Sequence, residues 1–204
     1  MTVITISRQI GAGGWTLGER LAKRLSYQYV DDIMIREIAD KIGVTAESIS
    51  AFEKDGATRL MKFLDKMVSK DFIRRHISDK YGYVDEEQYV GVITAIIKGL
   101  YDQGNVVIVG RAGQYILKGH ENVRHVLLIN NLKNRIRFVV EKYNVSDSEA
   151  ERIIKTMDRI RSNFLSFFAE KQYHDDPRCY DLAINMENIT MEKAETLVLD
   201  LIAP

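Results

Sequence analysis

The chain is poor in the residues that support several common kinds of site. A single cysteine, Cys179, excludes a disulfide framework and a zinc site built from several cysteines. No two of the four histidines stand at the spacing of metal ligands: His76, His120, His125 and His174. No apolar run approaches the roughly 18 residues that a membrane-spanning helix needs. The chain also starts directly on a strand-like pattern without a basic segment, so no signal peptide is expected.

An excess of charge of either sign is also lacking. Lysine plus arginine and aspartate plus glutamate each total 29, so the formal net charge is zero. A neutral chain has no broad electric field that would hold nucleic acid or an anionic membrane, although a local basic cluster can still bind a small anion. We therefore expect small-molecule partners, and neither nucleic acid nor a membrane among them. Because neither a signal peptide nor a membrane-spanning run is expected, we expect the protein to be cytoplasmic.

Short apolar runs separated by helical patterns indicate the fold class. The candidate strands are Val3–Ile6, Tyr29–Val30, Val106–Val109, Val126–Ile129 and Leu182–Ile184. Runs that are apolar on both faces suit parallel strands covered by helices on either side. Between the runs, apolar residues recur at helical spacing, as at Leu17, Leu21 and Leu25. The alternation predicts an α/β fold with three αβα layers around a five-stranded, mostly parallel sheet.

One long interval interrupts this alternation. Between about residues 33 and 104 the pattern is helical, with stretches around Ile35–Ile42, Leu60–Ile77 and Gln88–Leu100. The apolar residues of the last two stretches can pack internally or form a surface between copies of the chain, so a homo-oligomer stays open. Because the interval lies between two strands, we expect it to be an insert within one domain of residues 1–204.

A second helical insert is expected at about residues 146–180. Ser146 followed by Glu149 forms a plausible capping box at its start. Phe164, Phe167 and Phe168 follow at core-like spacing and are interpreted as packing residues. Tyr173 to Asp176 then form a polar loop, for which ordinary loop polarity is preferred to a catalytic His-Asp pair.

The segment after the first strand is the clearest candidate site. Gly11, Gly13 and Gly14 fall within four residues, immediately before a helix. Glycine lets the backbone turn its N–H groups toward an anion, and the helix dipole adds to the attraction. The simpler alternative is a strand-to-helix turn that tolerates glycine; the placement favours a phosphate-binding loop.

Neither common phosphate-loop fingerprint is complete. The dinucleotide pattern G-x-G-x-x-G requires glycine where Thr16 stands, although Asp31 lies near the expected ribose-binding distance. In the Walker pattern G-x-x-x-x-G-K-[ST], with Gly13 as the second glycine, Arg8 takes the first glycine position and Gly14 the lysine position.

An ordered set of segments resembles the cytidylate kinase-like family, a divergent branch of the P-loop nucleoside monophosphate kinases. Gly11–Leu17 resembles the Gly-Ala-Gly-Lys-Gly-Thr-Leu loop of cytidylate kinases with the lysine replaced. Tyr29–Asp32, Val107–Ala112 and Tyr180–Asn185 resemble three further family segments, in the expected order. No single segment is specific, but together they punctuate nearly the whole chain.

The resemblance implies ATP and Mg²⁺ as cofactors. The backbone N–H groups of Gly11, Ala12, Gly13, Gly14, Trp15 and Thr16 would hold the β-phosphate of ATP. Thr16 stands at the position of the hydroxyl that binds magnesium. The missing lysine is a serious departure, and Arg8 is the candidate substitute because its charge is permanent and its fork grips phosphate bidentately. Alternatively, Arg8 pairs with a nearby carboxylate for structure.

Three further residues are assigned to the acceptor nucleotide. Asp31 and Arg111 follow strands at the edge where parallel sheets bind ligands. By the resemblance, Arg111 binds the acceptor monophosphate and Asp31 contacts or orders the acceptor. Arg36, one turn into the next helix, faces the acceptor phosphate or merely solvent. Asp32 is interpreted as the N-cap of that helix.

The second insert carries the candidate lid arginines. Nucleoside monophosphate kinases close an arginine-bearing lid over the phosphates, which excludes water and neutralises charge. Arg159 and Arg161 match that position by resemblance; the alternative is a solvated helix face.

Two function classes remain open. The first is a nucleoside monophosphate kinase-like phosphotransferase that uses ATP and a cytidylate-type acceptor. The second is a nucleotide-binding module, a sensor or scaffold that kept the fold after losing the catalytic lysine. An NAD-dependent dehydrogenase is disfavoured by Thr16 and by the arginine-rich insert.

Overall fold

The computed structural model describes residues 1–42, 86–169 and 174–203. By its internal contacts the chain divides into two compact units. One comprises Met1–Asp32 with Gly104–Pro204, and the other comprises Ile33–Gln103. The first unit contains the sheet and the glycine-rich loop.

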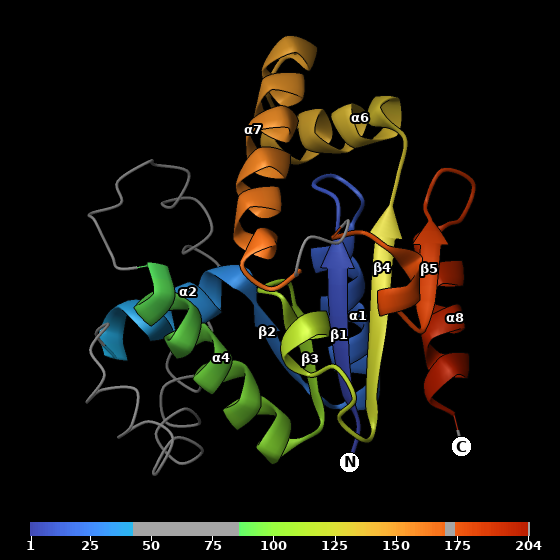
Figure 1. Cartoon of the computed structure of the whole chain (residues 1–204). Coiled ribbons are helices and arrows are strands. Elements are labelled where there is room, and N and C mark those ends of the chain that lie inside the picture. Colours follow the sequence, from blue (N-terminus) through green and yellow to red (C-terminus); the bar gives the residue numbers. More distant parts are fainter. Residues whose placement is uncertain (43–85, 170–173, 204) are drawn as a thin grey trace. The chain divides into compact units, whose positions relative to one another are not determined.

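The sheet has five strands in the order β2-β3-β1-β4-β5, and every pairing is parallel (Figure 1). The strands are β1 Val3–Arg8, β2 Gln28–Asp31, β3 Val106–Val109, β4 Val123–Ile129 and β5 Leu182–Asn185. All five predicted strands are confirmed, with the first, second, fourth and fifth extended by one to three residues. The parallel register brings the carboxyl ends of all strands to one edge, so β1, β2 and β3 deliver Arg8, Asp31 and Gly110 to the same edge of the sheet.

Helices α1 Gly14–Leu25 and α8 Met191–Ile202 cover one face of this sheet (Figure 1). Ile4 and Ile6 of β1 point toward them, and both side chains are fully buried. The principal core joins these residues to buried side chains from every layer on that side: Leu17, Leu21, Val107, Val109, Val126, Leu128, Ile184, Ala194 and Val198. The predicted helical spacing of Leu17 and Leu21 therefore places both in the core.

The short helix α5 Gly113–Ile116 lies against the opposite face of β1. Thr5 alternates with Ile4 and Ile6 and so faces this side. A Cβ at Gly113 would lie 3.1 Å from Cγ2 of Thr5, which shows how closely α5 approaches the strand. The first unit therefore has helices on both faces of a parallel sheet.

Helices α6 Leu132–Tyr143 and α7 Asp147–Ser166 form a hairpin beyond the carboxyl end of β4 (Figure 1). Asn131 caps α6, and its side chain accepts from the backbone N–H of Asn134. Ser146 caps α7 by accepting from the N–H of Glu149 at 3.3 Å, which confirms the predicted helix start. Such caps each contribute about 1 kcal/mol to helix stability.

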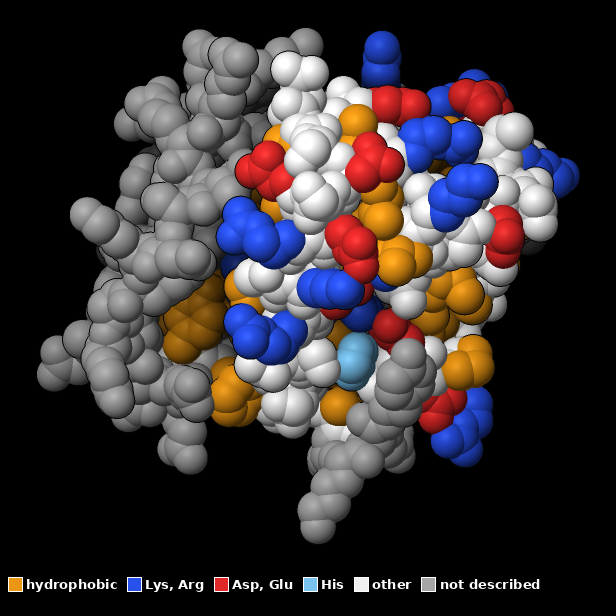
Figure 2. All heavy atoms as spheres, turned by 90° about the horizontal axis from the view of Figure 1, so that it is seen from above, with side chains coloured by type: hydrophobic (Ala, Val, Ile, Leu, Met, Phe, Trp, Pro, Cys, Tyr) orange, Lys and Arg blue, Asp and Glu red, His pale blue; other side chains and the backbone are white. Residues whose placement is uncertain are grey.

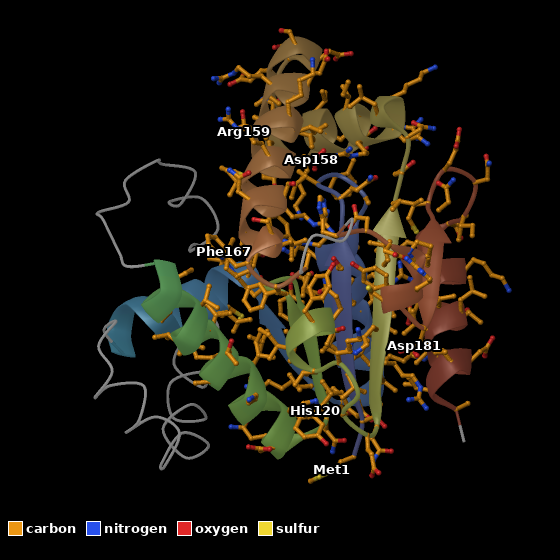
Figure 3. The ribbon with its side chains drawn as sticks, viewed as in Figure 1. Met1, His120, Asp158, Arg159, Phe167 and Asp181 are labelled. Carbon is orange, nitrogen blue, oxygen red and sulfur yellow. The ribbon has the colours of Figure 1, made fainter. Side chains whose placement is uncertain are left out.

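After α7, the 3₁₀ helix η2 Pro177–Cys179 leads into β5. The predicted packing of the three phenylalanines is correct for Phe164 and Phe168, whose ring centroids are 5.4 Å apart. It is wrong for Phe167, which lies at the C-cap of α7 and is 49% exposed (Figure 3).

The second unit contains α2, which spans Asp32–Ile42 and begins at the last residue of the first unit, and α4 Glu86–Gln103. These confirm two of the three predicted helical stretches, and the third, Leu60–Ile77, lies outside the described residues. None of the helices in the described ranges combines the length and apolar character that crossing a bilayer requires.

Candidate functional site

The glycine-rich loop joins β1 to α1 at the carboxyl edge of the sheet. Gly11 and Gly13 have φ values of +83° and +87°, a region that favours glycine. Gly13 is the N-cap of α1 and has no side chain to cap the first turn, and its carbonyl accepts from the N–H of Leu17 at 3.0 Å. The N–H groups of Gly14, Trp15 and Thr16 therefore belong to an uncapped helix start, the geometry that attracts anions.

The side chain of Arg8, at the end of β1, packs against Gly14 at the start of α1. Its side chain is buried, and Nη2 donates to Oδ1 of Asp32 at 2.8 Å. A Cβ built at Gly14 would lie 2.7 Å from Cγ of Arg8, and one at Gly110 would lie 2.6 Å from Nη1. The arginine thus runs through a channel that two glycines leave open. The structure thus contains the ion pair between Arg8 and a nearby carboxylate that the sequence analysis gave as the alternative role of Arg8.

Asp32 accepts hydrogen bonds from several donors, at its carboxylate and at its backbone carbonyl. Oδ1 also accepts from Nε1 of Trp15 at 3.1 Å, and the backbone carbonyl of Asp32 accepts from Nε of Arg111 at 3.2 Å. Burial by itself raises the pKa of Asp32, but the charges of Arg8 and then Arg111 outweigh it, so the pKa lies below its ordinary value. The interpretation of Asp32 as an N-cap is wrong: α2 begins at Asp32 itself, and its carboxylate binds the side chains of Arg8 in β1 and Trp15 in α1.

The turn after β3 holds an unusual backbone. Gly110, Arg111 and Ala112 have consecutive φ values of +89°, +52° and +58°. Non-glycine residues in this region carry strain, which tends to persist where the surrounding structure fixes the conformation. The N–H of Gly110 donates to the carbonyl of Ile6 at 2.9 Å, and the Arg111 guanidinium lies 5.1 Å from the ring centroid of Phe164. The turn therefore holds Arg111 beside Asp32 at the carboxyl edge.

The other two predicted acceptor residues lie on β2 and α2. Asp31 is nearly buried and its Oδ2 accepts from the hydroxyl of Tyr29 at 3.2 Å. Burial, and then the charge of Asp31, raise the pKa of the Tyr29 hydroxyl above its ordinary value, so it stays a donor. Arg36 lies in α2, and its side chain is outside the described part of the structure.

A small apolar cluster packs the α6–α7 hairpin against the glycine-rich loop. Val139 of α6 packs with Ala150 and Ile154 of α7, and Ile10 of the loop packs against this cluster. A Cβ at Gly11 would lie 2.8 Å from the backbone oxygen of Arg135, so the hairpin contacts the loop backbone as well. The loop and the hairpin therefore form one packed assembly.

Arg135 reinforces this contact and was missed by the sequence analysis. Its side chain is buried; Nε donates to the carbonyl of Ile10 at 2.6 Å and Nη2 to Oδ2 of Asp158 at 2.6 Å. No local sequence pattern distinguishes it from Arg137, two residues later, which is exposed. Arg135 is thus the residue that ties α6, α7 and the loop backbone together.

The two predicted lid arginines occupy different environments on α7. Arg161 is largely buried; it binds both carboxylate oxygens of Asp175, and Nη2 donates to Oγ of Ser7 at 2.9 Å. Burial lowers the pKa of Arg161, but the hydrogen bonds and charge of Asp175 outweigh it and hold the pKa above its ordinary value. Arg159 is exposed, on a different side of α7 from Asp158 (Figure 3). The structure therefore brings Arg161, and not Arg159, to the end of β1.

Asp175 was expected only as part of a polar loop, and its pairing with Arg161 was not predicted. The predicted polar loop around it is instead anchored at several points. The hydroxyls of Tyr115 and Tyr180 both donate to the carbonyl of His174, at 3.0 and 3.1 Å. His174 itself lies 4.0 Å from Asp175, too far for a catalytic hydrogen bond. The segment from His174 to Tyr180 therefore serves to position Asp175 against Arg161.

Trp15 occupies the place after the missing lysine and lies among cations. Its ring centroid is 5.8 Å from Cζ of Arg8 and 5.3 Å from Nζ of Lys142, which comes from the last turn of α6. Such distances allow cation–π attraction. Trp15 is also the only tryptophan of the chain, so its fluorescence reports on the loop.

The charges of this edge are mixed in sign. Figure 2, which looks down from above the view of Figure 1, shows Lys and Arg interspersed with Asp and Glu over the described residues. Within the described ranges, no group of three or more His, Cys, Asp and Glu side chains is arranged to hold a metal ion.

Comparison with known proteins gives a consistent picture. Among solved structures, an uncharacterized protein from Eubacterium ventriosum matches with a TM-score of 0.72 at 19% identity, covering 99% of this chain and 98% of that one. A shikimate kinase from Acinetobacter baumannii in complex with shikimate matches with a TM-score of 0.51 at 18% identity, covering 99% and 93%. At these identities both show the fold, the P-loop αβα arrangement that was predicted. No curated protein matches the chain. The model of the cytidylate kinase-like family matches residues 3–188, and the chain belongs to that family.

Proposed function

We propose that the protein is a nucleoside monophosphate kinase-like phosphotransferase that moves the γ-phosphoryl group of ATP to a cytidylate-type acceptor. One observation carries the proposal: an uncapped helix start, preceded by glycines with positive φ, stands at the sheet edge beside Arg8 and Arg111. Membership of the cytidylate kinase-like family supports the same reading.

In this proposal the N–H groups of Gly11 and of Gly13 to Thr16 bind the β-phosphate of ATP. The N–H of Ala12 donates to the carbonyl of Gln9 at 3.1 Å and shapes the loop instead. An oxygen of the acceptor phosphate attacks the γ-phosphorus, the bond to the bridging oxygen breaks, and ADP leaves with the electron pair. Such a reaction asks the protein mainly for positioning and positive charge. Mg²⁺, held through Thr16 and the phosphates, would neutralise part of the developing charge.

Acceptor binding is assigned to Asp31, Arg36 and Arg111. Arg111 is positioned by a strained turn, and its Nε already donates to the backbone of Asp32. Arg8 and Arg161 supply buried positive charge near the end of β1, and exposed Arg159 would add charge when a lid closes. The helical insert of about residues 33–104 would recognise the base, and residues of about 146–180 would form the lid, all within one cytoplasmic domain of residues 1–204.

A second candidate is a nucleotide-binding module without turnover. The observation that favours it is the absence of lysine at Gly14 together with the neutralisation of Arg8 by Asp32. Losing one cation from a dry phosphate site costs about 3 kcal/mol or more of transition-state stabilisation when nothing replaces it.

A coupled assay of ADP release separates the two candidates. ATP and magnesium are offered with CMP, dCMP, UMP and AMP, and with shikimate because of the structural match. Turnover with a cytidylate acceptor supports the kinase. ATP binding by calorimetry without turnover for any acceptor supports the module, and absence of ATP binding contradicts both.

Matched arginine variants sharpen this test. Arg111→Ala should raise the KM for the acceptor by tenfold or more, because a charge-assisted phosphate contact is lost. Arg137→Ala removes an exposed arginine on α6 and should leave both kinetic constants unchanged.

A further inference from the structure

The space that a lysine at position 14 would need is already filled. A Cβ at Gly14 would meet Cγ, Cβ and Cδ of Arg8 at 2.7, 2.9 and 3.2 Å. Separations below 3.0 Å are closer than packed carbon atoms tolerate. Gly14 begins α1, and its φ lies outside the left-handed region that glycine alone favours, so the obstacle is space and not backbone conformation.

Arg8 cannot move aside without losing its partners. Its Nη2 is bound to Asp32 at 2.8 Å, and its guanidinium occupies the space that Gly110 leaves open. Only 7% of Arg8 is exposed, so neighbouring atoms surround its side chain on nearly every side. Moving it would also leave the carboxylate of Asp32, which is three-quarters buried, without its nearest cation.

We propose that the side chain of Arg8 and a lysine side chain at position 14 cannot occupy this site together. The cation beside the loop is then Arg8, which comes from β1 and points toward Asp32 and Gly110. Arg8 therefore requires glycine at position 14, and the absence of a lysine there follows from the presence of Arg8. The steric part stands on the packing alone; its consequence for ATP rests on the proposed function.

A double-substitution cycle in thermal unfolding tests the steric part. Gly14→Ala should lower the Tm by several degrees. In the Arg8→Ala background the loss should be about half as large or less, because the contacts at 2.7 and 3.2 Å disappear while the Cβ contact at 2.9 Å remains. An equal loss in both backgrounds overturns the proposal.

Two controls keep this cycle interpretable. Gly113→Ala, whose Cβ would face Thr5 and not Arg8, should cost the same with and without Arg8. If Arg8→Ala alone does not fold, the Arg8→Ala/Asp32→Asn background removes the unpaired carboxylate, and the same comparison is made there.

Calorimetric titration with ATP tests the functional part. Gly14→Lys should bind ATP about tenfold more weakly than the unsubstituted chain, whereas Arg8→Ala/Gly14→Lys should bind at least tenfold more tightly than Gly14→Lys. A stable Gly14→Lys variant that binds ATP more tightly while Arg8 is present overturns the proposal. If the unsubstituted chain binds no ATP, the proposed function fails, while the unfolding cycle still decides the exclusion.

Discussion

Nη2 of Arg135 lies 2.6 Å from Oδ2 of Asp158, so one ion pair joins α6 to α7 beside the glycine-rich loop. The same guanidinium holds the carbonyl of Ile10. Because Arg135 is 6% exposed and Asp158 about one-third exposed, the pair is partly shielded from water. The hairpin and the loop should therefore lose stability together when this arginine is removed.

Arg135→Ala is expected to lower the free energy of unfolding by about 2–3 kcal/mol, since a partly buried ion pair and a carbonyl hydrogen bond are lost. Urea unfolding measures the change. Arg137→Ala on the same helix is the control and should stay within about 0.5 kcal/mol of the unsubstituted chain. Equal effects of the two substitutions would show that the contact contributes nothing.

Substitutions of Arg161 and Arg159 should have different effects, on the stability of the fold and on kcat respectively. Arg161→Ala leaves Asp175 buried without its cation and should cost about 3–5 kcal/mol of stability. Arg161→Lys should recover only part, because lysine cannot bind both carboxylate oxygens in the same way. Arg159→Ala should leave the urea midpoint unchanged and, if lid closure brings it to the phosphates, lower kcat alone. An Arg161→Ala variant with unchanged stability would contradict the assignment.

The parallel sheet could be predicted because its signal is local. Each strand is a short apolar run, and Val106–Val109 is reproduced residue for residue. The Arg8–Asp32 contact depends instead on the order β2-β3-β1, which places Asp32 across the sheet edge from Arg8. No periodicity encodes that order, and a helix-start aspartate is more often a cap.

The roles of Arg135 and Asp175 could not be predicted for the same reason, because they too depend on the tertiary arrangement of the chain. Arg135 and Asp175 acquire their partners through tertiary contacts, from Ile10, 125 positions away, and from Arg161, 14 positions away. In the sequence each stands among other charged residues. The glycine-rich turn before α1 could be predicted because glycines before a helix have a local conformational meaning. An arginine has none until the fold places a carboxylate beside it.

The pH dependence of stability should reveal the state of Asp32. Its folded pKa is below the ordinary value of 3.8, so the ionised carboxylate stabilises the fold above that pH. This stabilisation is lost as the pH falls from about 3.8 through the folded pKa. Asp32→Asn should therefore be less stable than the unsubstituted chain at pH 7, and the difference should shrink below pH 4 in urea unfolding. A difference that stays constant from pH 7 to pH 3 would argue against a stabilising Asp32 charge.

The strained turn at Arg111 allows stability and acceptor binding to be separated at one position. Both Arg111→Gly and Arg111→Ala remove the guanidinium, so both should raise the KM for the acceptor equally. Glycine adopts a φ of +52° without penalty, whereas alanine keeps the strain. The glycine variant should therefore be more stable than the alanine variant by about 1 kcal/mol. Urea unfolding and acceptor kinetics on the two proteins give both values. Equal stability would mean that the turn carries no strain, and an unchanged KM in both would remove Arg111 from the acceptor site.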